Sequence, residues 1–187
     1  MKFIWMLRAI TYKLFFGSFG LISYIGQPIY ISGVKNIFFG KRVRIYPHSR
    51  IESLGGKIQI GDNVSIGQNL HLICKLNVFI GDKTTISANV FISDVDHEYV
   101  NINVHIMEQV LNSKETVIGE NCFIGYGCVI LPGTILGKQC IVGANSVVKG
   151  VFPDYCVVAG SPARIIKRYD PIDALWKKTD ILGNFFI

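Results

Sequence analysis

The chain has 187 residues, of which 50% are hydrophobic and 17% charged, and its formal net charge is +6. This length suits one domain with terminal attachments, and the hydrophobic fraction is sufficient for a continuous core. Five cysteines are an odd number, which argues against a secreted protein held by disulfides and favours buried free thiols in a reducing cytoplasm.

The N-terminal segment, residues 1–36, is predicted to be helical, apolar and basic. Up to Ile51 there are eight Lys or Arg and no acid, whereas the remainder has eleven basic and thirteen acidic residues. Aromatic and aliphatic residues interleave with the cations from Met1 to Gly26, as in a helix that lies at a membrane interface. Alternatively, the helix only caps the open end of the fold. Pro28 weakens a transmembrane interpretation of the uncharged run from Leu14 to Val34.

Residues 37–163 follow a six-residue period. Eight times an aliphatic residue is followed at once by glycine, in the pairs Leu54-Gly55, Ile60-Gly61, Ile66-Gly67, Ile80-Gly81, Ile118-Gly119, Ile124-Gly125, Leu136-Gly137 and Val142-Gly143. The same spacing continues without glycine at Leu72, Ile86, Ile92 and Ile130, and we call all these aliphatic residues, with or without glycine, the markers of the repeat. A fixed short period over most of a chain indicates a solenoid, in which each repeat covers its neighbour.

The period predicts an all-β parallel β-helix. Three six-residue faces make a triangular coil of eighteen residues, and successive coils stack about 4.8 Å apart as parallel strands. We expect the corner glycines to supply unusual backbone angles. A β-sandwich, the alternative, would show turn signals about every 8–12 residues. Four places after each marker we expect a second inward side chain, at Ile58, Val64, Leu70, Leu76, Thr84, Val90, Cys122, Cys128, Thr134, Cys140 and Ser146.

The period is interrupted twice. Between Leu72 and Ile80 the step is eight residues, which predicts a bulge. Polar residues 94–115 then separate Ile92 from the next marker, and we expect an extruded loop, which on a rigid scaffold usually carries function. Residues 164–187 form a tail, and a short helix is predicted over residues 171–178.

His97 at the start of that loop is a candidate general base. An imidazole titrates near neutrality and can accept a proton from a hydroxyl, while a neighbouring carboxylate can fix its tautomer. Asp94 and Asp96 stand close by in the sequence. A loop histidine can equally be an ordinary surface residue, and the local sequence leaves both interpretations open.

A family resemblance bears on this choice. The run from Phe91 to His97, followed by a loop and then by residues 116–121, resembles the segment that carries the catalytic histidine in galactoside and maltose acetyltransferases and in glycan O-acetyltransferases of the colanic-acid and O-antigen type. The resemblance to these hexapeptide-repeat acyltransferases covers roughly Phe39 to Lys167. It implies a left-handed β-helix, a homotrimer, and direct transfer from acetyl-CoA to a sugar hydroxyl, with His97 as base and Asp94 and Asp96 beside it.

The same resemblance implies the remaining site residues. Asn69 and His71 stand where relatives bind the acceptor. A backbone amide near Gly125 and Tyr126 would stabilise the oxyanion. The coenzyme would lie in a groove between neighbouring subunits, lined by Phe123 (often tryptophan in relatives), Gly125, Tyr126, Gly143, Ala144, Ser146, Ser161, Arg164, Lys167 and Arg168.

Other functions stay open. An N-acetyltransferase acting on an amino sugar nucleotide is the nearest alternative, and a non-catalytic β-helix that only binds a ligand is another. A carbonic anhydrase would need three histidines converging on zinc, and we expect no metal ligands and no nucleic-acid partner. The free cysteines favour a cytoplasmic protein. The apolar, basic N-terminus favours one that is peripheral at the inner face of the cell membrane, whose acceptor is a glycan or its lipid-linked precursor.

Overall fold

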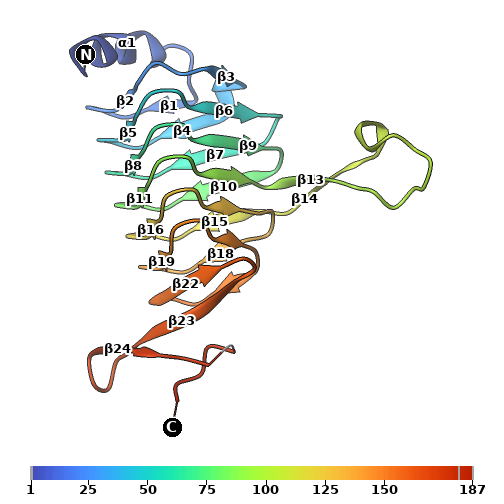
Figure 1. Ribbon diagram of the computed structural model, residues 1–187. Coiled ribbons are helices and arrows are strands. Elements are labelled where there is room, and N and C mark those ends of the chain that lie inside the picture. Colours follow the sequence, from blue (N-terminus) through green and yellow to red (C-terminus); the bar gives the residue numbers. More distant parts are fainter. Residues whose placement is uncertain (1, 181, 187) are drawn as a thin grey trace.

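The computed structural model describes residues 2–180 and 182–186 as a parallel β-helix with one α-helix at its N-terminal end (Figure 1). Face A consists of β1 (Ser18–Phe19), β4 (Ile37–Phe39), β7 (Lys57–Ile60), β10 (Asn77–Ile80), β15 (Thr116–Ile118), β18 (Ile135–Leu136) and β21 (Val151–Phe152). Face C consists of β3 (Tyr30–Ser32), β6 (Arg50–Ser53), β9 (His71–Cys74), β12 (Phe91–Ser93), β17 (Val129–Ile130) and β20 (Val147–Val148).

Face B completes each triangular coil and carries the C-terminal strands. Its members are β2 (Tyr24–Ile25), β5 (Arg44–Ile45), β8 (Ser65–Ile66), β11 (Thr85–Ile86), β16 (Phe123–Ile124), β19 (Ile141–Val142), β22 (Cys156–Gly160), β23 (Ala163–Asp170) and β24 (Leu175–Lys178). The chain therefore passes through faces A, B and C in turn, and the predicted solenoid is confirmed.

The inward aliphatic residues stack in rows because neighbouring coils pair in register. On face B, Ile66, Ile86 and Ile124 are successive partners, and each is at most 1% exposed. All five cysteines are buried free thiols, as predicted. The second inward positions are buried except Leu76, which is 53% exposed. This prediction was wrong because the eight-residue step turns Leu76 outward and places Val78 in the core.

Close stacking of coils, rather than unusual backbone angles, explains most of the repeated glycines. A Cβ on Gly81 would lie 2.5 Å from the backbone nitrogen of Glu120 in the next coil, and one on Gly119 would lie 2.6 Å from the carbonyl carbon of Gly137. Positive φ angles fall two residues later, at residues such as Asn63 and Asn121, since asparagine tolerates the left-handed region. The expectation for these glycines is therefore corrected.

The N-terminal helix is shorter than predicted. α1 spans Lys2–Tyr12, and residues 18–32 already contain three strands of the first coil, so the predicted boundary at residue 36 is too late. The helix packs on that coil through Ala9, which is buried, and Trp5, whose ring lies 5.7 Å from that of Tyr24. The capping role is thus confirmed. Among the described helices none has the length and apolar character needed to cross a bilayer.

The predicted C-terminal helix is wrong. Residues 171–174 form a turn after Asp170, whose Oδ1 accepts a hydrogen bond from the backbone nitrogen of Ile172 at 2.9 Å. β24 then runs back along β23 in an antiparallel ladder. Lys177 Nζ lies 2.6 Å from Asp170 Oδ2 across this ladder. The open edge of face B supplies hydrogen-bond partners that an isolated short helix would lack.

The extruded segment leaves the solenoid at the corner between faces C and A. β13 (Val95–His97) pairs with β14 (Leu111–Ser113) in an antiparallel hairpin, and the 3₁₀ helix η2 (Ile106–Glu108) lies near its tip. Figure 1 shows the hairpin projecting from the body at mid-height. The predicted loop over 94–115 therefore matches the projection and its base.

Candidate active site

A pocket of about 400 Å³ lies at the base of this hairpin. Its walls come from the face C strands and the corner that follows β6, from both strands of the hairpin and from η2. The lining residues are Leu54, Ile73, Phe91, Ser93, Val95, Asp96, His97, Met107 and Leu111. Its lining is mainly apolar, with polar groups concentrated along β12 and β13, a pattern typical of ligand pockets. The sequence-predicted base, His97, is part of this wall.

His97 is half-buried at the end of β13, where it is the cross-strand partner of Leu111. Its Nδ1 atom is buried and has no hydrogen-bond partner among the described residues. Asp96 is exposed, and its Oδ1 accepts a hydrogen bond from the backbone nitrogen of His97 at 2.9 Å. Asp96 therefore fixes the backbone beside the imidazole, and within this chain the ring itself is left available.

Asp94, predicted to act beside His97, has a different position. Its side chain is fully buried, and its two oxygens accept hydrogen bonds from the backbone nitrogens of Lys75, Leu76 and Asn77 at 2.6–2.8 Å. These amides belong to the eight-residue bulge of the preceding coil. The carboxylate is thus committed to the corner from which the hairpin emerges, and the proposed catalytic role is corrected to a structural one.

His71 lies on face C next to the pocket. It pairs with Phe91, and the two rings meet edge to face with centroids 5.2 Å apart. The pKa of His71 is lowered mainly by burial and secondly by the positive charge of Arg50, while the negative charge of Glu52 opposes this shift. The imidazole is therefore neutral near pH 7 and can accept a hydrogen bond.

Asn69, the other predicted acceptor residue, occupies the corner between faces B and C. Its φ angle is 61°, and its Nδ2 donates to Asn89 Oδ1 at 2.7 Å. Asn89 in turn donates to the hydroxyl of Tyr126. Asn69 thus belongs to a ladder of corner residues, at the end of face C opposite the hairpin.

The predicted coenzyme residues lie together on face B and its corner with face C. Phe123, which is 43% exposed, begins a row that continues through Ile141 and Val157 to Lys167. A parallel row of small residues follows at the corner, comprising Gly125, Gly143, Ala144 and Ala159, with Arg164 as the partner of Ala159 and Ser161 in the adjoining turn.

Two of these predictions need correction or refinement. Ser146 is fully buried, and its Oγ donates to the Gly143 carbonyl at 2.7 Å and accepts from the Gly160 nitrogen at 3.1 Å, so it supports the corner and cannot touch a coenzyme. Arg168 donates from Nη1 to the Gly183 carbonyl at 3.3 Å, and its Nε is buried without a partner among the described residues. Part of that guanidinium is therefore already used by the C-terminal tail.

Within one chain, His97 and the predicted coenzyme residues are not brought together. His97 lies at the corner between faces C and A, whereas the coenzyme row lies on face B and at the corner between faces B and C. The full width of face C separates them, and the pocket at the hairpin base contains none of the predicted coenzyme residues.

Phe91, Arg50 and Glu52 were missed by the sequence analysis. Phe91 lines the pocket, and Arg50 and Glu52 form an ion pair one coil away from His71. Register links Phe91 and Arg50 to His71, because residues 50, 71 and 91 are successive partners on face C. Glu52 follows Arg50 by two residues on the same strand. The coils there exceed eighteen residues, so a strict six-residue period does not align them.

The remaining histidines lie elsewhere. His48 is an exposed corner residue, and His105 caps η2 by accepting from the Met107 nitrogen at 3.2 Å. Among the described residues no three His, Cys, Asp or Glu side chains gather as a metal site would require.

Replacing Asp94 tests its structural role. Asp94→Ala would remove the acceptor of three part-buried backbone amides, and we expect a loss of about 2–4 kcal/mol in the free energy of unfolding. Asp94→Asn, which keeps one acceptor oxygen, should lose less. The matched control Asp96→Ala, at an exposed position, should stay within about 0.5 kcal/mol of the wild type. Denaturant titration measures all three, and equal stabilities for Asp94→Ala and Asp96→Ala would contradict this assignment.

Comparison with known proteins supports a family assignment. The bacterial transferase hexapeptide family (six repeats) matches residues 115–150, and the hexapeptide repeat of succinyl-transferase matches residues 57–94. WbbJ of Escherichia coli K12, named as a lipopolysaccharide biosynthesis O-acetyl transferase, is 36% identical over 159 residues, which cover 81% of each chain.

Solved structures agree with the fold. A galactoside acetyltransferase in complex with coenzyme A superposes with a TM-score of 0.59 at 28% identity, covering 89% of this chain and 72% of the other. AntD, an N-acyltransferase from Bacillus cereus solved with dTDP and 3-hydroxybutyryl-CoA, superposes with a TM-score of 0.75, covering 89% of this chain and 90% of the other. At 22% identity the latter likeness concerns the fold alone. From its repeats and from its similarity to WbbJ, the chain belongs to the hexapeptide-repeat acyltransferase family.

Proposed function

We propose that the protein is an acetyl-CoA-dependent O-acetyltransferase that acts on a sugar hydroxyl of a cell-surface glycan or of its lipid-linked precursor. The observation that carries the proposal is the imidazole of His97, placed in a pocket and free of hydrogen-bond partners among the described residues. The similarity to WbbJ and to a galactoside acetyltransferase that binds coenzyme A supports both the co-substrate and the acceptor class.

In the proposed reaction, His97 removes the proton of the sugar hydroxyl as its oxygen attacks the thioester carbonyl carbon of acetyl-CoA. The tetrahedral intermediate collapses by breaking the C–S bond, and the imidazolium returns the proton to the departing thiolate. An amide near the coenzyme row would stabilise the oxyanion. The Gly125 nitrogen already donates to the Val142 carbonyl at 2.9 Å, so the amide of Tyr126 is the better candidate.

His97→Ala should lower kcat for acetyl transfer by about 100- to 10,000-fold, because it removes the general base. Coenzyme binding, measured by calorimetry, should be retained because the predicted coenzyme residues lie at another corner. The matched control is His48→Ala, at an exposed corner outside the pocket, which should leave kcat unchanged. A His97→Ala enzyme within a few-fold of the wild type would remove His97 from the mechanism.

We further propose that the enzyme is a homotrimer in which each active site joins the hairpin of one subunit to the face B groove of its neighbour. The separation of His97 from the coenzyme row within one chain supports this arrangement. So does the hairpin tip, where Tyr99, Ile102 and Val110 expose apolar side chains that a neighbouring subunit could cover.

Mixed trimers test the shared site. His97→Ala and Ala144→Trp subunits should each be inactive alone, the second because a bulky side chain fills the proposed groove. In trimers assembled randomly from equal amounts, about a quarter of the sites would combine an intact histidine with an intact groove. We therefore expect about a quarter of wild-type activity, measured after co-refolding. Mixtures no more active than the separate variants would indicate that each site lies within one subunit.

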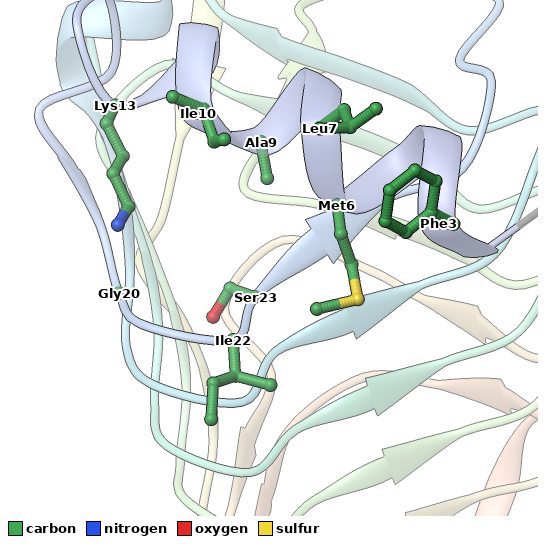
Figure 2. Close-up of a pocket in the computed structure, with 9 residues that line it drawn as sticks. All are labelled: Phe3, Met6, Leu7, Ala9, Ile10, Lys13, Gly20, Ile22 and Ser23. Atoms are coloured by element: carbon green, nitrogen blue, oxygen red, sulfur yellow. The ribbon is translucent and has the colours of Figure 1, made fainter.

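Peripheral contact with an anionic membrane surface is the remaining part of the proposal, and would place the enzyme at the cytoplasmic face of the membrane. Figure 2 shows α1 lying over the loop before β2, with Phe3, Met6, Leu7 and Ile10 along an apolar pocket and Lys13 at its end. The pocket holds about 330 Å³, and most of these side chains are exposed. Exposed apolar groups combined with basic residues favour interfacial binding.

Substituting Phe3, Leu7 and Ile10 by Gln should abolish sedimentation with vesicles containing phosphatidylserine, because these exposed side chains would provide the apolar insertion. The matched control substitutes Ile172, Leu175 and Leu182, exposed at the opposite end of the molecule. Point variants are preferable to a truncation of the N-terminal segment, because a truncation would also remove Phe16 and Phe19 from the core. If the wild-type protein does not bind such vesicles at low salt, α1 is only a cap.

A further inference from the structure

Face C carries an exposed row of side chains that begins at the His97 pocket and runs toward the N-terminal end. Phe91, His71, Arg50 and Tyr30 are successive partners on β12, β9, β6 and β3. Three steps between parallel strands span about 14 Å. The predicted coenzyme residues lie on coils that follow the hairpin in the sequence, so this row extends away from them.

The row has aromatic residues at its two ends, Phe91 and Tyr30, and polar residues, His71 and Arg50, between them. Arg50 Nε lies 2.5 Å from Glu52 Oε1, and the Arg50 guanidinium lies 5.4 Å from the centroid of the Tyr30 ring. The Glu52 side chain is only 12% exposed, whereas that of Arg50 is 49% exposed, so the carboxylate is anchored on the sheet and the guanidinium stays accessible. His71 Nε2 is 3.9 Å from Glu52 Oε1, and it is buried without a hydrogen-bond partner among the described residues.

The row is continuous with the pocket. Ile73, the strand partner of Glu52, lines the pocket together with Phe91, and Phe91 packs on the ring of His71. A ligand whose hydroxyl reaches His97 can therefore extend along face C without crossing a barrier between the two regions.

These groups suit a chain of sugar rings. Carboxylate oxygens and the unprotonated nitrogen of a neutral imidazole accept hydrogen bonds from sugar hydroxyls, and guanidinium groups donate hydrogen bonds to those hydroxyls. Aromatic side chains pack against the apolar faces of sugar rings. The strands of face C contain one cation, Arg50, and one anion, Glu52. Because each offsets the other, the row offers no excess positive charge for the diphosphate of a nucleotide sugar.

We propose that Tyr30, Arg50, Glu52 and His71 form an extended subsite that selects a neutral oligosaccharide as acceptor, with the acetylated unit at His97 and further units along face C. This inference rests on the proposed function. It makes the protein an enzyme of assembled glycan chains, so that glycosyl transfer must precede acetylation.

The test compares acceptors of increasing length. Wild-type and variant enzymes receive radiolabelled acetyl-CoA and neutral gluco-, galacto- and manno-oligosaccharides of one to four units, with UDP-glucose and UDP-galactose in parallel. We expect kcat/KM to rise at least tenfold from monosaccharide to trisaccharide. Glu52→Gln and Arg50→Ala should lower kcat/KM for the trisaccharide about ten- to hundredfold more than for the monosaccharide, as expected for lost hydrogen bonds to charged groups.

The matched control is Arg44→Ala, because Arg44 lies in the same coil as Arg50 but on face B. It should leave the dependence on chain length unchanged. Tyr30→Ala, at an exposed position, provides a second variant should Glu52→Gln disturb folding, which thermal melts would reveal.

The possible outcomes separate the two proposals. Equal losses on short and long acceptors, a preference for the nucleotide sugars, or a change of oligomeric state in Glu52→Gln and Arg50→Ala, detected by light scattering, would overturn the extended subsite while the acetyltransferase assignment stands. The last result would mean that a neighbouring subunit covers face C. A wild-type enzyme that acetylates extracted lipid-linked glycans but none of these acceptors would overturn the extended subsite alone. One that acetylates neither would overturn the proposed function as well.

Discussion

The structure depends on the parallel hydrogen-bond ladder between coils, which requires each coil to follow the one before it in register. Because neighbouring backbones approach so closely, most of the repeated glycines have no room for a side chain, as at Gly81 and Gly119. The same stacking forms the continuous rows of Ile and Val that make the core. Burial of those rows provides the main stabilisation, because no coil could cover its own apolar side chains.

A continuous hydrogen-bond ladder offers few positions at which the chain can depart from the solenoid. The hairpin departs at a corner that is reinforced by a buried carboxylate. The corner between faces C and A lengthens at Leu76, and Asp94 binds the backbone amides of this bulge. That carboxylate holds the coil closed directly beneath β13. The position of His97 therefore depends on a buried side chain that does not contact the pocket.

The repeat also arranges the site along an axis. Coils that precede the hairpin carry the polar and aromatic row of face C, and coils that follow it carry the small residues and cations of face B. In the proposed shared site, an acceptor and a coenzyme bound by these two sets of coils would meet at the level of His97. Such a division allows either half to change by substitution of outward residues, because the inward rows that stabilise the fold are separate from them.

The sequence alone was sufficient to determine the solenoid, because its six-residue period states which side chains point inward. It also located His97, since a polar insertion in a regular array is visible without coordinates. Neither the exposure of Leu76 nor the burial of Asp94 could be read from the period, because an eight-residue step and hydrogen bonds to the amides of the preceding corner change the side to which a residue points. The strand at Leu175–Lys178 required the free edge of face B. Only the tertiary structure placed Arg50, His71 and Phe91 in one row, because their alignment depends on the actual length of each coil.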